Sequence, residues 1–126
     1  MHVGRLKLKL QLTCGDGFAM GPGKADILEA IDREGSISAA GRTLGMSYRR
    51  TWLLVDEMNR SFLEKVIETQ KGGSLERGAK LTVLGRTVLD AYRALEKKSA
   101  ALTEDPAYAS LLSVLRDEPL PSKSTQ

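Results

Sequence analysis

The chain has 126 residues, a length that fits one domain with a single core. Its composition, 41% hydrophobic and 28% charged, is that of a soluble globular protein, and no apolar run is long enough to span a bilayer. Cys14 is the only cysteine and His2 the only histidine, which excludes an internal disulfide and His-based catalytic triads.

The net charge of +3 is unevenly distributed along the chain. Residues 36–86 hold nine basic and five acidic side chains, whereas residues 1–35 hold five of each and residues 87–126 hold five basic and six acidic ones. A local basic surplus is expected of a surface that meets phosphates. Residues 36–86 are therefore the segment most suited to contact nucleic acid.

The N-terminal part predicts one strand followed by a loop. Residues 5–12, RLKLKLQL, alternate polar and apolar side chains, which is typical of a half-buried strand. A lone strand is unstable, so it needs a partner strand. Residues 14–24 hold four glycines and one proline and are expected to form a loop.

Three helices follow, each with a start or stop signal. The first spans 22–34 and ends at Gly35. The second, about 37–44, is capped by Ser36 and ended by Gly45, and the third, about 48–62, is capped by Ser47. Asp26, Glu29 and Asp32 share one face of the first helix, which we expect to be exposed to solvent rather than to bind metal.

The C-terminal half predicts a hairpin and a long helix. Strands are expected at 63–70 and 79–83 around an exposed tip, residues 71–78. A helix at about 82–103 is capped by Thr82, and a short helix is expected at 107–116 before a disordered tail, residues 117–126. The long helix carries an apolar seam of Leu84, Val88, Ala91, Tyr92, Leu95 and Leu102.

This order of elements predicts a mainly α protein with a small β-sheet. A strand, three helices, a hairpin and a long helix make a winged helix-turn-helix domain, expected to span residues 1–116. The corner of the motif needs small residues where its helices touch, which Ala39, Ala40 and Gly41 supply. It also needs a residue tolerant of positive φ in the turn, and Gly45 meets that need.

The start of the third helix has the residues of a DNA-reading helix. Ser47, Tyr48, Arg49 and Arg50 follow the turn directly, where recognition helices contact base edges. The alternative is an ordinary solvated face, on which the arginines could in addition pair with Asp56 or Glu57.

Three consecutive apolar side chains follow on the same helix, at residues 52–54. Trp52 is expected to pack in the core rather than to stack on a base. Of Leu53 and Leu54, one is expected to touch a thymine methyl and the other to pack against the wing or a partner.

The hairpin adds a second basic element. Lys71, Arg77 and Lys80 surround its glycines, a pattern that suits backbone or minor-groove contact, although an ordinary exposed turn has the same composition. The predicted DNA-binding residues are Ser36, Ser47, Tyr48, Arg49, Arg50, Lys71, Gly72, Arg77 and Lys80.

Residues 35–59, GSISAAGRTLGMSYRRTWLLVDEMN, resemble the DNA-binding domain of the ModE family of bacterial molybdate-responsive transcriptional regulators. The shared features are the Gly-Ser-Ile-Ser opening, the Gly-x-Ser-Tyr-basic start of the third helix, Trp52 and the final Glu-Met-Asn. The N-terminal amphipathic strand and the Gly-rich wing followed by Leu-Thr-x-x-Gly also match, a wing pattern shared with LysR-type regulators. The resemblance covers roughly residues 4–103.

The N-terminus, MHVGRLKLKLQL, lacks the continuous apolar block of a signal peptide, so we expect a cytoplasmic, nucleoid-associated location. The resemblance implies a homodimer that binds double-stranded DNA at a palindromic operator and is related to molybdenum-dependent gene regulation. It implies a dimer contact through the long helix, at Leu84, Val88, Tyr92, Leu95 and Leu102. Full-length members carry C-terminal β-barrel domains that bind molybdate, and we expect this chain to lack them. We expect no catalysis, no metal and no resident cofactor, with molybdate or another oxyanion as the candidate effector.

Two alternatives remain open. One is a winged-helix module that binds another protein and no DNA. The other is a short regulator that responds to a signal other than molybdate.

Overall fold

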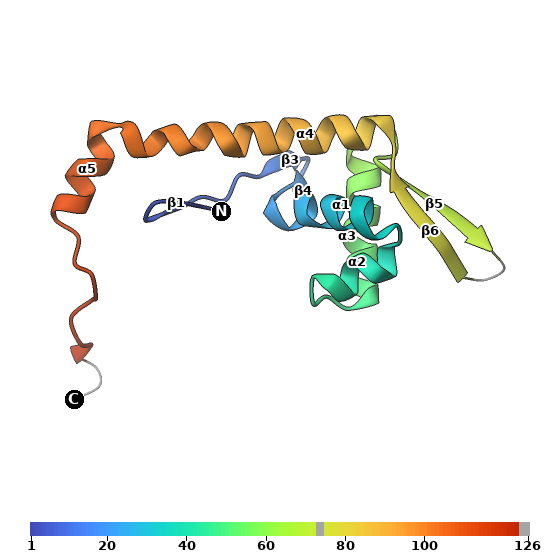
Figure 1. The fold of residues 1–126 in the computed structure, drawn as a ribbon, viewed down its shortest axis with the longest axis horizontal. Coiled ribbons are helices and arrows are strands. Elements are labelled where there is room, and N and C mark those ends of the chain that lie inside the picture. The colour runs from blue at the N-terminus through green and yellow to red at the C-terminus, as the bar shows by residue number, and fades with distance from the viewer. Residues whose placement is uncertain (73–74, 124–126) are drawn as a thin grey trace.

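The computed structural model describes residues 1–72 and 75–123 (Figure 1). It contains three antiparallel two-stranded sheets and five α-helices within those ranges. In chain order the elements are β1 (His2–Val3), β2 (Leu6–Lys7), β3 (Leu12–Cys14), β4 (Gly17–Met20), α1 (Pro22–Glu34), α2 (Ile37–Thr43), α3 (Tyr48–Ser61), β5 (Ile67–Gly72), β6 (Leu75–Leu81), α4 (Val83–Lys98), a 3-10 helix (Ser99–Glu104) and α5 (Pro106–Ser113). The predicted fold class, mainly α with a small β content, is confirmed.

The helices α1 to α3 and the β5–β6 hairpin gather beneath the N-terminal end of α4 (Figure 1). The helix α4 runs on beyond this body, and α5 lies at its far end. Within the described ranges, no helix combines the length and the hydrophobicity that a bilayer crossing requires.

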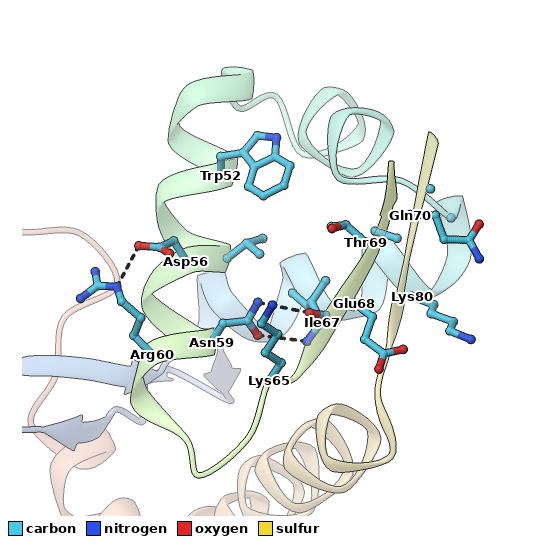
Figure 2. Close-up of a pocket in the computed structure, with 14 residues that line it drawn as sticks. Trp52, Asp56, Asn59, Arg60, Lys65, Ile67, Glu68, Thr69, Gln70 and Lys80 are labelled. Atoms are coloured by element: carbon cyan, nitrogen blue, oxygen red, sulfur yellow. Dashed lines mark hydrogen bonds and ion pairs between the residues drawn. The ribbon is translucent and has the colours of Figure 1, made fainter. Parts of the chain in front are cut away.

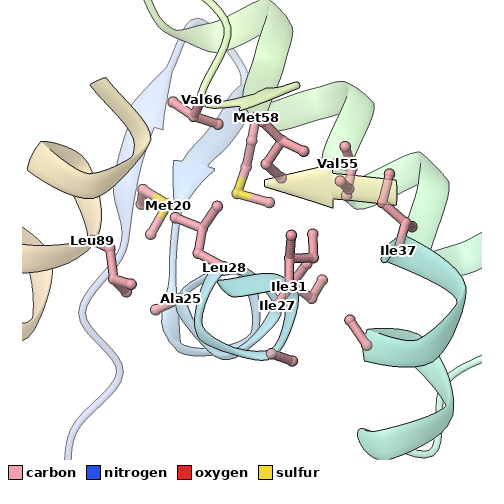
Figure 3. Packing of buried hydrophobic residues seen from close by; sticks show 14 of the residues in the cluster. Met20, Ala25, Ile27, Leu28, Ile31, Ile37, Val55, Met58, Val66 and Leu89 are labelled. Atoms are coloured by element: carbon pink, nitrogen blue, oxygen red, sulfur yellow. The ribbon is translucent and has the colours of Figure 1, made fainter. Parts of the chain in front are cut away.

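The core is built around α1 (Figure 3). Ile27, Leu28 and Ile31 recur along one stripe of this helix and are fully buried. They pack with side chains from every neighbouring element: Met20, Ile37, Val55, Met58, Val66, Ile67 and Leu89. This single cluster holds the helix-turn-helix, the base of the hairpin and α4 together.

The single strand predicted at residues 5–12 is wrong. Two short hairpins occupy this region, β1 with β2 and β3 with β4, and residues 8–11 between them are not a strand. Each hairpin has a two-residue loop whose first residue, Gly4 or Gly15, has a positive φ of 59° or 58°. The loop predicted at 14–24 is also wrong, because it contains β4 and the start of α1.

The wing strands are displaced from their predicted positions. They span Ile67–Gly72 and Leu75–Leu81 rather than 63–70 and 79–83. Pairing continues to Gly72 opposite Leu75, so most of the expected tip, residues 71–78, is strand. Residues 73 and 74 lie outside the described residues.

The predicted caps are confirmed. The hydroxyl groups of Ser36, Ser47 and Thr82 accept hydrogen bonds from backbone N–H groups three residues on, at 3.0, 3.1 and 2.9 Å. Gly35 ends α1 with a φ of 78°, as expected of a left-handed cap. The helix predicted at 82–103 is α4 followed by the 3-10 helix.

The acidic face of α1 is exposed, as expected, and it also pairs with α4. Arg93 contacts Asp26 at 2.8 Å, Glu29, and Glu96 at 2.6 Å, while Arg86 contacts Asp32. Burial by itself lowers the pKa of Arg93, but the hydrogen bonds to these three carboxylates outweigh it and raise the pKa above its ordinary value. The pairs with Asp26, Glu29 and Asp32 join the long helix to α1, whereas Glu96 lies on α4 itself.

We predict that Gly41→Ala destabilises the fold by roughly 1–3 kcal/mol, because of overpacking where α2 meets α3. A Cβ at residue 41 would lie 2.5 Å from Thr51 Oγ1 and 3.4 Å from the Met46 carbonyl oxygen. Urea unfolding measures the loss. The matched control is Gly23→Ala in α1, where a Cβ meets nothing within 4 Å. Equal stability of the two variants would contradict the close contact.

Candidate nucleic-acid interface

The corner between α2 and α3 is closely packed. Gly41 faces the fully buried Thr51, whose hydroxyl donates a hydrogen bond of 2.8 Å to the Ser47 carbonyl. The turn closes through the Met46 N–H, which donates to the Gly41 carbonyl at 2.8 Å, and Gly45 adopts a φ of 70°. The predicted roles of Gly41 and Gly45 are both confirmed.

The first turn of α3 is held open to solvent. Ser47 caps the helix, and Tyr48, Arg49 and Arg50 are all exposed. The Tyr48 ring meets the Trp52 ring edge-on, with centroids 6.1 Å apart and planes at 70°. This contact steadies the Tyr48 ring while 52% of the residue remains exposed.

Arg49 and Arg50 have no acidic partner within the described part of the chain. The nearest acidic candidates in sequence are already paired, Asp56 with Arg60 at 2.8 Å and Glu57 with Lys24 at 2.7 Å. The suggested pairing of the two arginines with Asp56 or Glu57 is therefore wrong, whereas the alternative of a solvated face stays open, since both arginines are exposed. Two unpaired guanidinium groups stand at the start of the exposed helix.

The opposite side of α3 faces the core. Thr51, Val55 and Met58 are its buried residues. Trp52 is half-buried and packs against the core cluster, as expected, and it also lines a groove beside the hairpin (Figure 2). Its indole N–H is buried and has no hydrogen-bond acceptor among the described residues.

Asn59 ties α3 to the wing (Figure 2). Its Oδ1 accepts hydrogen bonds from the N–H groups of Val66 and Ile67, at 2.8 and 3.1 Å, and its Nδ2 donates to the Ile67 carbonyl at 3.2 Å. The Asn59 side-chain amide thus pairs with the backbone at the start of β5 as the peptide group of a neighbouring strand would. This role was not predicted from the sequence, although Asn59 belongs to the Glu-Met-Asn signature.

The wing has two further anchors. The Ala79 N–H donates to the Gly35 carbonyl at 2.8 Å, which fixes β6 against the end of α1. Thr82 donates from its N–H to the Val66 carbonyl at 3.0 Å and from its hydroxyl to the Lys65 carbonyl at 2.7 Å. The hairpin base is therefore held by α1, α3 and the start of α4.

A groove of about 920 Å³ lies between α3 and the wing (Figure 2). Its charged lining comes from both sides: Asp56, Arg60, Lys65, Glu68 and Lys80. Lys80 is exposed and lies opposite Glu68 in the strand pair. Lys71, Gly72 and Arg77 belong to the wing strands, but the side chains of residues 71–77 lie outside the described residues.

The predicted apolar seam runs along α4 to Leu102 in the 3-10 helix, and it divides into a packed half and an exposed half. Leu84 and Val88 are half-buried against the core, and Tyr92 is buried with its hydroxyl donating to the Leu10 carbonyl at 2.7 Å. Burial, followed by the charge of Glu96, raises the pKa of Tyr92. Leu95 and Leu102 are 61% and 45% exposed.

A mainly apolar hollow of about 440 Å³ adjoins the exposed half of α4. Leu10, Leu12 and Met20 line one side of it, and Val88 and Leu95 line the other. Leu89, which the sequence analysis left out of the seam, is the buried leucine of α4. The described residues contain no group of three or more His, Cys, Asp or Glu side chains that could hold a metal ion.

The fold is similar to that of a solved DNA-binding domain. The structure is similar to the DNA-binding domain of CbnR, solved in complex with DNA, with a TM-score of 0.54 and 23% sequence identity. The similarity covers 69% of this chain and 95% of that domain. The winged helix-turn-helix architecture predicted from the sequence is confirmed.

The chain is homologous to the ModE-type molybdenum proteins. It is 35% identical over 96 residues to the molybdenum transport protein ModE of Azotobacter vinelandii, which covers 76% of this chain and 36% of that protein. It is 41% identical over 86 residues to the molybdenum-pterin-binding protein MopB of Rhodobacter capsulatus, covering 68% and 32%. The DNA-binding transcriptional dual regulator ModE of Escherichia coli K12 is 33% identical over 106 residues, covering 81% and 39%.

The chain therefore spans about a third of the length of the curated relatives it matches. No family model matches it. The resemblance drawn from residues 35–59 is confirmed, and the names of these relatives agree with the expectation that the chain is not an enzyme.

We predict that Asn59→Ala lowers the free energy of unfolding by roughly 1–3 kcal/mol, because it leaves the Val66 and Ile67 amides without acceptors. Amide hydrogen exchange at these two positions should quicken more than in α1. The control is Arg60→Ala, which removes an exposed ion pair worth at most about 1 kcal/mol. Unchanged exchange at Val66 and Ile67 in the Asn59 variant would contradict the anchoring role.

Proposed function

We propose that the chain is a sequence-specific, double-stranded DNA-binding transcriptional regulator. The observation that carries the proposal is the exposed start of α3, where Arg49 and Arg50 follow the helix-turn-helix corner without acidic partners in the described structure. A recognition helix contacts base edges with its N-terminal residues, and an arginine can bind guanine through two hydrogen bonds.

The other predicted contacts fit a backbone role in this proposal. Ser36 and Ser47 stand at the N-termini of α2 and α3, where helix ends favour phosphate. Tyr48 is exposed beside the two arginines. Lys71, Gly72, Arg77 and Lys80 lie on the wing, from which they would contact phosphates or the minor groove.

We further propose that the regulator is a homodimer on a palindromic operator. Leu95 near the end of α4 and Leu102 in the 3-10 helix that follows are exposed apolar side chains, and Leu95 also lines the apolar hollow at Leu12. Leu84, Val88 and Tyr92 then support this contact from within the fold rather than forming its exposed surface. A two-fold dimer would place two recognition helices about one DNA turn apart, roughly 34–36 Å.

The link to molybdenum rests on the relatives, two of which carry molybdenum in their names and one of which is named a transcriptional regulator. Mapping the sites that the protein binds across a genome tests this link to molybdenum. The competing proposal is a winged helix that binds only protein. The exposed apolar residues of α4 favour it, but these also serve a homodimer.

We predict that the wild-type protein binds a selected duplex with an affinity that falls steeply with salt, with a log–log slope of about −0.9 for each phosphate contacted. Replacing Arg49 and Arg50 by alanine should cost roughly 1–3 kcal/mol for each lost guanine contact and remove the preference for the selected sequence. Fluorescence anisotropy against selected and scrambled duplexes measures both effects.

The matched control for that experiment is Lys97→Ala with Lys98→Ala, which removes the same charge from the exposed far end of α4. This variant should keep the sequence preference. If the Arg49 and Arg50 double variant keeps it as well, or if the wild type binds no DNA, the regulator proposal fails.

We predict that Leu95→Glu shifts the protein from dimer to monomer at micromolar concentration, because a carboxylate would be buried in an apolar interface. Sedimentation velocity measures the shift. Val83→Glu is the control, since Val83 is also exposed and begins α4, where an acidic residue is favourable. A wild-type monomer, or a Leu95→Glu dimer, would contradict the α4 contact.

A further inference from the structure

One leucine lies at the centre of the outward face of α3. The buried residues of this helix are Thr51, Val55 and Met58. At 3.6 residues per turn, Leu53 lies on the side opposite to them, one turn beyond Arg49 and one turn before Asp56. Leu53 is 54% exposed.

Among the described residues, Leu53 belongs neither to the hydrophobic core cluster nor to the partly buried side chains packed against it, whereas Leu54 packs against that cluster. This separates the two adjacent leucines that the sequence left unresolved. The wing groove does not use Leu53 either, since α3 contributes only Trp52, Val55, Asp56, Asn59 and Arg60 to its lining.

Single exposed leucines are common on protein surfaces, so exposure alone assigns Leu53 no role. Its position on α3 is the informative feature. Arg49, Leu53, Asp56 and Arg60 recur every three or four residues, so Leu53 is the apolar member of an otherwise charged stripe. Its Cα lies about 6 Å along the axis from that of Arg49. A helix that puts Arg49 against base edges puts Leu53 against them as well.

We infer that Leu53 reads a thymine by packing against its C5-methyl group in the major groove. That methyl group is the apolar feature by which the major groove distinguishes thymine, and a leucine has no hydrogen-bonding atom with which to read any other base edge. The inference rests on the proposed DNA-binding function and adds a residue that sets specificity. Arg49 and Arg50 would read guanine, and Leu53 would require thymine one helical turn away.

The test replaces each thymine of the selected duplex, one at a time, with deoxyuridine, which removes the methyl group and keeps the base pair. At one thymine position in each half-site, the replacement should weaken wild-type binding about fourfold. This is the value expected when one methyl group loses its apolar contact. Leu53→Ala should bind the thymine and deoxyuridine duplexes equally and lose a similar factor on the thymine duplex. The control is Leu63→Ala, which is fully exposed just after α3 and should keep the wild-type ratio.

Each remaining outcome overturns the inference. If the wild type tolerates deoxyuridine at every position, no methyl group is read. If Leu53→Ala keeps the wild-type ratio, another residue reads it. If Leu53→Ala changes self-association in sedimentation, and not the ratio, the side chain is a protein contact. DNA binding that depends on Arg49 and Arg50 would survive these outcomes, whereas a protein that binds no DNA refutes both proposals.

Discussion

The geometry of the candidate interface depends on the Asn59 side chain. A winged helix presents two separate elements to one ligand, and their relative position must be fixed before binding. Asn59 does this with three hydrogen bonds between α3 and the first residues of β5. Its neighbours in the Glu-Met-Asn signature act in the same region: Glu57 pairs with the buried Lys24, and Met58 lies in the core. The signature therefore positions the interface.

Much of this architecture is visible in local sequence signals. Ser36, Ser47 and Thr82 mark helix starts because a hydroxyl at that position satisfies a free backbone N–H. Gly35 and Gly45 mark the two stops because both adopt positive φ. The small residue at Gly41 correctly indicated a close helix contact. These signals depend on a few neighbouring residues, so they can be recognised directly in the sequence.

The errors have two causes. The alternation in residues 5–12 indicated one strand, although the turn glycines Gly4 and Gly15 were a local sign of two hairpins. The other errors concern partners further along the chain. The wing begins at Ile67 because Asn59 binds the chain there, a contact between residues eight apart. Tyr92 shares the helical seam with Leu95, yet it turns inward because the Leu10 carbonyl accepts its hydroxyl. The acidic face of α1 is paired because Arg86 and Arg93 reach it from α4. Contacts between residues that are distant in the sequence cannot be predicted from a local pattern.

In the proposed function, the start of α3 and the wing form one surface that meets DNA. The sharpest test is to record amide chemical shifts of the 15N-labelled chain while its selected duplex is added. Large shifts are expected at residues 47–53 and along the wing strands, with little change at the exposed end of α4 beyond Leu95. Shifts concentrated on α4 and α5, with residues 47–53 unchanged, would contradict it.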